Sequence, residues 1–100
     1  MRDQRVMISH HASLVRLRTS IKNRVHALLA IEGIQTSEFS DLFAKRGMEF
    51  LRRVKLRQVR REVLDNYLEV LKALEERIEE MEAIFIGVRI RDWDSNYWTF

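Results

Sequence analysis

The sequence predicts an all-α fold, and its composition and its apolar periodicity both indicate this. Among the 100 residues there is no proline, there are only three glycines, and 33% of the residues are charged. Such a composition is typical of long helices with solvated flanks rather than of a sheet with tight turns. Two long segments also carry apolar residues at spacings of three and four. We therefore expect two long helices joined by short helices, a helical hairpin or coiled coil that forms a dimeric bundle.

The first long helix is predicted at about residues 8–32. Its buried face recurs every three or four positions, as one face of a helix requires. Gly33 stands where a left-handed residue would end the helix, and Ile34 can supply the apolar contact of a Schellman motif. The stripe consists of Leu14, Leu17, Ile21, Val25, Leu28 and either Leu29 or Ile31.

Short helices are predicted at about residues 37–53. Thr36 or Ser37 can cap a first short helix, "EFSDLFAKR", and Gly47 is expected to end it. Met48, Phe50 and Leu51 then belong to a second short helix or to a continuation past a bend.

The second long helix is predicted at about residues 57–86, because a seven-residue repeat runs through it. Val63, Leu68, Val70 and Ile84 widen this stripe. Gly87 is expected to end the helix, which leaves residues 87–100 as an aromatic tail, either disordered or docked. The a and d positions are Leu64, Tyr67, Leu71, Leu74, Ile78, Met81 and Phe85.

A helix of this length spans about 45 Å, which is longer than a compact domain of this size needs. The protruding half would expose its apolar seam, a patch that monomers avoid. We therefore expect a homodimer in which the second half of the helix pairs with a second copy. The predicted interface consists of Leu71, Leu74, Ile78, Met81 and Phe85.

Charge is strongly segregated along the chain, whose net charge is +3. Residues 52–61, "RRVKLRQVRR", hold six bases and no acid, and the first long helix has a second basic face. These residues can bind phosphates, or acidic residues on neighbouring helices can offset them. The candidate nucleic-acid-binding residues are Arg16, Arg18, Lys22, Arg24, Arg52, Arg53, Lys55, Arg57, Arg60 and Arg61.

No catalytic residue and no cofactor is predicted. The chain has no cysteine, its histidines lack zinc-ligand spacing, and it has no phosphate-binding glycine loop. Asp92, Asp94 and Asn96 resemble the start of a calcium loop, but the glycine and terminal glutamate of that loop are missing. No metal, small-molecule substrate or membrane partner is expected, and no apolar run is long enough to span a bilayer. We expect a cytoplasmic protein that is not an enzyme.

Three segments, "RLRTSIKNRVHALLAIEGI", "DLFAKRGMEFL" and "LDNYLEVLKALEERIEEME", occur in this order. Together, over about residues 12–85, they resemble the middle segment of insertion-sequence transposases with a RuvC-like DEDD catalytic domain, relatives of the pilin-inverting recombinase. In that family the segment forms a coiled-coil region between the catalytic domain and a serine-bearing domain. The matching positions are Arg18, Thr19, Lys22, Asn23, Arg24, Leu28, Leu29, Gly33, Leu42, Phe43 and Gly47.

The resemblance implies a dimerising segment that helps to place catalytic domains around DNA and guide RNA. The chain lacks the four acidic catalytic residues and the serine domain, so we expect a fragment, or a remnant of a truncated or frameshifted transposase gene. Two functions follow as hypotheses: a non-catalytic dimerisation and assembly module derived from a mobile element, and, as the alternative, a small basic nucleic-acid-binding protein.

Overall fold

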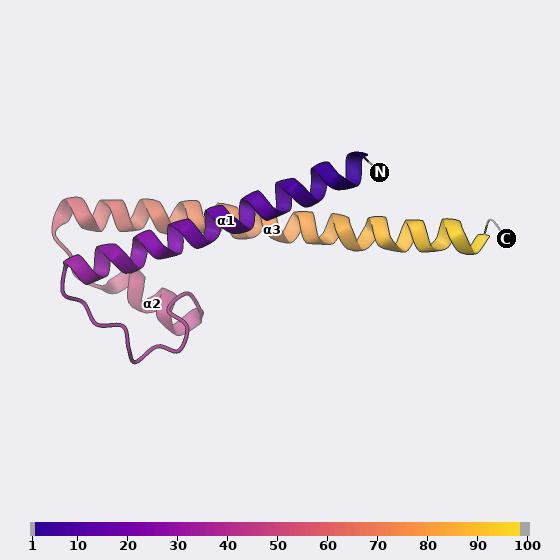
Figure 1. Cartoon of the computed structure of the whole chain (residues 1–100). Coiled ribbons are helices and arrows are strands. Elements are labelled where there is room, and N and C mark those ends of the chain that lie inside the picture. Colours follow the sequence, from indigo (N-terminus) through magenta and orange to yellow (C-terminus); the bar gives the residue numbers. More distant parts are fainter. Residues whose placement is uncertain (1, 99–100) are drawn as a thin grey trace. The chain divides into compact units, whose positions relative to one another are not determined.

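The computed structural model describes the backbone of residues 2–98 and the side chains of residues 4–87. It contains three helices, α1 (Arg2–Ile31), α2 (Lys45–Arg53) and α3 (Gln58–Trp98) (Figure 1). No strand occurs in the backbone so described, and the all-α prediction is confirmed. None of the helices, over the part of the chain described, is long and apolar enough to cross a membrane.

The two long helices contribute to two compact units. Unit 1 combines residues 1–18 with residues 72–100, and unit 2 is the continuous segment 19–71. Each unit therefore contains one part of α1 and one part of α3, and unit 2 also contains α2.

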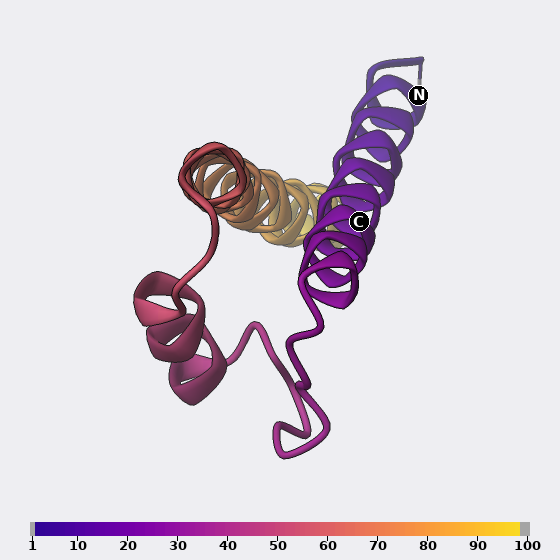
Figure 2. The ribbon, with the colours of Figure 1, turned by 90° about the vertical axis from the view of Figure 1, so that its left-hand side faces the viewer.

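The main hydrophobic core lies in unit 2. In Figure 2 the segment 32–44 and α2 lie together on one side of the α1 and α3 turns that belong to this unit. Half-buried residues of that segment and of α2, including Phe39 and Phe50 with ring centroids 5.0 Å apart, pack around the core. The buried core residues are Val25, Leu29, Leu42, Leu51, Leu64 and Leu68.

The end of α1 is the Schellman motif that the sequence predicts. Gly33 has a φ of 72°, its N–H donates to the Ala30 carbonyl, and the Ile34 N–H donates to the Leu29 carbonyl at 2.9 Å. Ile34 also packs against the core. Both bonds of the motif and its apolar contact are thus present.

The short helix predicted for "EFSDLFAKR" does not form, and this prediction is corrected. Turns occupy residues 37–44, where the Phe43 N–H donates to Oδ1 of Asp41 and the Ala44 N–H donates to the Asp41 carbonyl. A side-chain acceptor of this kind competes with the helical ladder. Gly47 does not end a helix either, because it lies inside α2.

Gly47 allows α2 to lie directly against the backbone of the preceding turn. A Cβ atom at position 47 would lie 1.9 Å from the Leu42 carbonyl oxygen. Only a residue without a side chain fits there, and Leu42 itself is buried in the core.

The predicted seam of α3 faces inward at every position. The first three a positions, Leu64, Leu71 and Ile78, are buried, and the remaining seam residues, including Phe85 at the fourth a position, are half-buried. The prediction that Gly87 ends the helix is wrong, because α3 continues to Trp98. The suggestion that the aromatic tail docks on the protein concerns residues whose side chains lie outside the described part of the chain.

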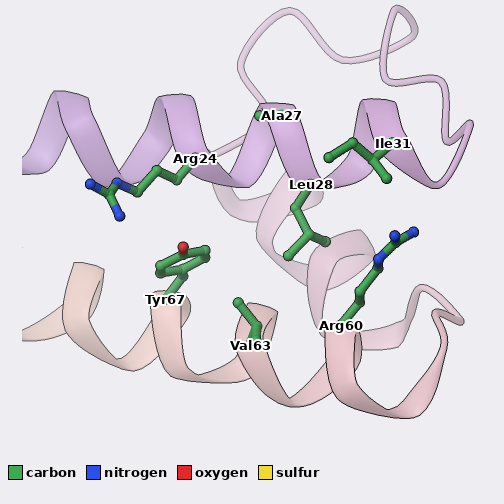
Figure 3. A pocket seen from close by; sticks show the side chains of 7 residues that line it. All are labelled: Arg24, Ala27, Leu28, Ile31, Arg60, Val63 and Tyr67. Carbon is green, nitrogen blue, oxygen red and sulfur yellow. The ribbon is translucent and has the colours of Figure 1, made fainter.

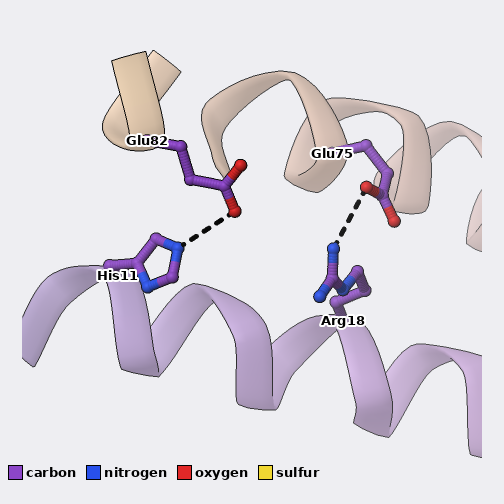
Figure 4. A network of polar contacts seen from close by, with 4 residues as sticks. All are labelled: His11, Arg18, Glu75 and Glu82. Carbon is purple, nitrogen blue, oxygen red and sulfur yellow. Dashed lines mark hydrogen bonds and ion pairs between the residues drawn. The ribbon is translucent and has the colours of Figure 1, made fainter. Parts of the chain in front are cut away.

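Unit 1 holds its two helical segments together with polar contacts between α1 and α3 (Figure 4). Nε2 of His11 lies 3.4 Å from Glu82, and the Arg18 guanidinium lies 3.2 Å from Glu75. These pairs are seven residues apart on each helix and run in opposite directions, so the segments are antiparallel. The His11 ring also meets Phe85 edge-on, with centroids 5.3 Å apart.

Candidate functional site

Three of the ten predicted phosphate-binding residues form ion pairs inside the chain. Arg18 pairs with Glu75 in unit 1, and Arg60 on α3 lies 3.0 Å from Glu32 at the end of α1. Arg61 pairs with Asp65 on its own helix. Arg18 and Arg60 are thus offset by acids on or next to the other long helix, as the alternative to nucleic-acid binding requires, whereas Arg61 is offset by an acid on its own helix.

Arg61 also has a structural role within unit 2. Its guanidinium donates to the Val54 carbonyl at 2.7 Å. Val54 is the C-cap residue that follows α2, and this bond satisfies a carbonyl group at the end of the helix.

The other predicted basic residues have different environments. Lys22 Nζ lies 5.2 Å from the Phe43 ring centroid in a cation–π contact. Arg16 and Arg53 make local hydrogen bonds, to the Ser13 hydroxyl and to the Glu49 carbonyl respectively. Arg52, Lys55 and Arg57 are exposed and, within the described part of the chain, form no ion pair. Arg24 is also exposed and lines a groove described below.

The residues predicted to pair with a second copy are covered within a single chain. Leu71 is 3% exposed and Ile78 is 1% exposed, so neither offers surface to another molecule in this fold. Leu74, Met81 and Phe85 are half-buried. The physical reason is that α1 packs antiparallel to α3: in unit 1, His11 lies beside Glu82 and Arg18 beside Glu75, so the turns of α1 between them run beside the seam of α3.

A groove between α1 and α3 of unit 2 is the hollow that sequence reasoning missed. Its volume is about 310 Å³, and Figure 3 shows its side chains between the two helices with α2 and the loop behind them. It therefore lies on the face that α2 leaves uncovered. The walls are mostly apolar, with one arginine on each helix. The lining residues are Arg24, Ala27, Leu28, Ile31, Arg60, Val63 and Tyr67.

The apolar surface continues from the groove along the outside of α3. Val59, Val63, Asn66 and Val70 follow one another at spacings of four, three and four, which places them on one helical face. All four are exposed, and Val59 is 70% exposed. On α1, Ile31 is 67% exposed beside the groove. We call this uncharged surface of α3, together with the groove, the open face.

The open face is bordered by carboxylates on the side away from α1. Glu62 is two residues after Arg60, and Glu69 is two residues after Tyr67; both Arg60 and Tyr67 line the groove. Because two residues turn a helix by about 200°, the two glutamates lie on the side of α3 away from the groove. Both glutamates are exposed. Arg24 is the positive charge that α1 contributes to the groove.

Few polar side chains line the groove. The residues that line the groove include two arginines and Tyr67, but no carboxylate, histidine, serine, threonine or cysteine. Across the described residues, no group of three or more metal-ligating side chains lies together. The groove presents an apolar surface with two arginines, Arg24 on α1 and Arg60 on α3.

Neither a protein-family model, nor a curated protein, nor a solved structure matches this chain.

Proposed function

We propose that the protein is a non-catalytic helical module that forms a homodimer, and that it associates through the open face of unit 2. The observation that carries this proposal is the exposed, uncharged stripe of α3 beside an apolar groove. It replaces the interface predicted from the sequence, whose central residues are buried within the chain.

The packing of unit 2 supports this role. In unit 2, α1 and α3 form a layer whose one face packs against α2 and the preceding loop. Its other face carries the mostly apolar groove. Stable helical domains bury such faces against another layer. Burying one large aliphatic side chain stabilises by roughly 1.5–3 kcal/mol, so covering Ile31, Val59 and Val70 would add a substantial driving force.

The resemblance to the coiled-coil segment of transposases supports the same role by analogy. In those enzymes the segment is an assembly element without catalytic residues of its own. We accordingly propose an origin in a mobile element, with Arg18, Lys22 and Gly33 among the shared positions.

The test is the mass of the protein in solution, measured by size-exclusion chromatography with light scattering. The chain has a mass of 12.0 kDa, and we expect twice this mass. Val70→Asp places a carboxylate in the open face and should return the mass to that of one chain. Lys72→Asp introduces the same group two residues along, on the opposite side of α3, and should leave the dimer intact. A wild-type protein that is monomeric at high concentration would overturn the proposal.

Nucleic-acid binding is the second candidate, and a specific observation favours it. Arg52, Lys55 and Arg57 are exposed around the junction of α2 and α3, without ion pairs in the described part of the chain. Three phosphate contacts would give a log–log salt dependence with a slope of about −2.7 on duplex DNA. Replacing the three residues with glutamine should abolish binding, whereas Arg61→Gln should change it little. Absence of binding to duplex DNA and RNA at low salt would remove this candidate.

A further inference from the structure

We infer that two copies of unit 2 pack face to face about a two-fold axis parallel to their helices, so that α1 of one copy lies on α3 of the other. Arg24 of each copy then forms an ion pair with Glu69 of the second copy. This inference rests on the proposed dimer and specifies its geometry.

Two symmetric arrangements of such a layer are available, and they differ in which helices meet. An axis parallel to the helices places α1 on α3 of the other copy, whereas a perpendicular axis in the plane of the layer places α1 on α1 and α3 on α3. The charges on the open face distinguish them.

The charges of the open face are arranged asymmetrically. Arg24 is the charge that the α1 side of the groove carries, and Glu62 and Glu69 border the stripe on α3. In the arrangement that places α3 on α3, Glu62 and Glu69 of both copies would lie along the same edge of the dimer, where their charges repel. Stacking α1 on α3 instead brings the arginine of one copy to the glutamates of the other.

The heights of these residues along the layer agree with this pairing. The Glu32–Arg60 ion pair shows that the end of α1 is level with the start of α3, and Arg24 and Tyr67 line the same groove. An axis parallel to the helices preserves height, so Arg24 of one copy lies near the level of residue 67 in the other. Glu69 is only two residues further, a rise of about 3 Å, which a flexible arginine side chain easily covers.

The apolar residues match at the same register. Ile31 immediately precedes Glu32 and so lies close to the level of the Glu32–Arg60 pair, which places it against Val59 and Val63 of the second copy. Ala27, one turn before Ile31, is small enough to let the two helices approach closely near Asn66 of the second copy. The exposed apolar groups of each copy are thus covered by those of the other.

Neither partner of the proposed ion pair is engaged within its own chain. Arg24 and Glu69 are both exposed, and neither has an ion pair among residues 4–87. This distinguishes Arg24 from Arg60, which already pairs with Glu32. Arg24 is therefore the arginine of the groove that remains available to a second molecule.

Charge reversal tests the geometry by sedimentation equilibrium of the full chain. Arg24→Glu and Glu69→Arg should each raise the dimer dissociation constant by roughly tenfold, because each places two like-charge contacts in the symmetric interface. The double variant Arg24→Glu/Glu69→Arg restores both pairs and should return the constant to near the wild-type value. Arg52→Glu, a reversal on α2 outside the open face, is the matched control and should change nothing.

The outcomes separate this inference from the proposed function. If wild type dimerises but the single reversals have no effect, or the double variant does not recover, the α1-on-α3 geometry is wrong while dimerisation stands. A monomeric wild type overturns both. Equimolar mixing of the two single variants should produce a heterodimer as tight as wild type, because both ion pairs are then re-formed between chains. No tightening on mixing would also overturn the inference. Circular dichroism of each variant confirms that the fold is retained.

Discussion

Replacing Gly47 with alanine should destabilise the protein, although alanine is the better helix former. Gly47 lies within α2, where a glycine normally costs about 1 kcal/mol relative to alanine. Helix propensity alone therefore predicts a stabilised variant. The contact with the turn before α2 predicts the opposite sign.

The magnitude follows from the distances around position 47. A Cβ there would lie 1.9, 2.3 and 2.6 Å from the O, C and Cα atoms of Leu42. Carbon contacts are favourable at about 3.5–4.0 Å, so α2 and the turn must separate by more than an ångström. Because all three atoms belong to the backbone, no side chain can rotate away. Overpacking of this kind costs about 3 kcal/mol, which leaves a net loss of about 2 kcal/mol after the propensity gain.

The assay is thermal unfolding followed by circular dichroism, with all proteins at one concentration. For a domain of this size, a loss of about 2 kcal/mol lowers the melting temperature by roughly 8–16 °C. Gly87→Ala is the matched control, because Gly87 also lies in a helix but a Cβ there meets no atom within 4 Å. It should melt at the wild-type temperature or a few degrees above. A Gly47→Ala variant as stable as Gly87→Ala would refute the close approach of α2 to Leu42.

Three further changes test other parts of the fold by urea denaturation. Ile78→Ala should lower the free energy of unfolding by about 2–4 kcal/mol, because Ile78 is buried within one chain. The variant should still form the proposed dimer; if it folds but no longer dimerises, the seam of α3 is the interface after all. Arg61→Met should cost about 1–2 kcal/mol through the lost hydrogen bond to Val54, whereas Arg57→Met, which removes an exposed neighbour, should cost almost nothing. Gly33→Ala should cost about 1 kcal/mol, because Gly33 has a φ of 72°; an unchanged stability would contradict the Schellman ending.

The features that were predictable from the sequence are those that depend on local patterns. A glycine after an apolar stripe predicted the end of α1, and both hydrogen bonds of the motif are present at Gly33 and Ile34. The seven-residue repeat predicted which residues of α3 turn inward. In both cases the signal extends over neighbouring residues, and no distant part of the chain can alter it.

The errors concern places where a local pattern supports two structures. Asp41 can sit in a first helical turn or accept a hydrogen bond from the Phe43 N–H, and the latter occurs. Gly47 can end a helix or admit a close neighbour, and here it admits Leu42. Such choices are decided by the core around them, which sequence periodicity does not describe.

The burial of Leu71 and Ile78 within one chain was not predicted, for a related reason. The α3 helix carries two apolar stripes, the inward seam that includes Leu71 and the exposed stripe that includes Val63 and Val70. The sequence shows both, since the exposed stripe also recurs at spacings of four and three, but it does not show which one the chain covers itself. That depends on the other helix, because α1 packs antiparallel against the inward seam of α3, as the His11–Glu82 and Arg18–Glu75 pairs show in unit 1. Because the stronger stripe is used within the chain, the weaker, uncharged stripe is the surface on which we propose that a second copy packs, with the exposed Arg24 and Glu69 at its borders.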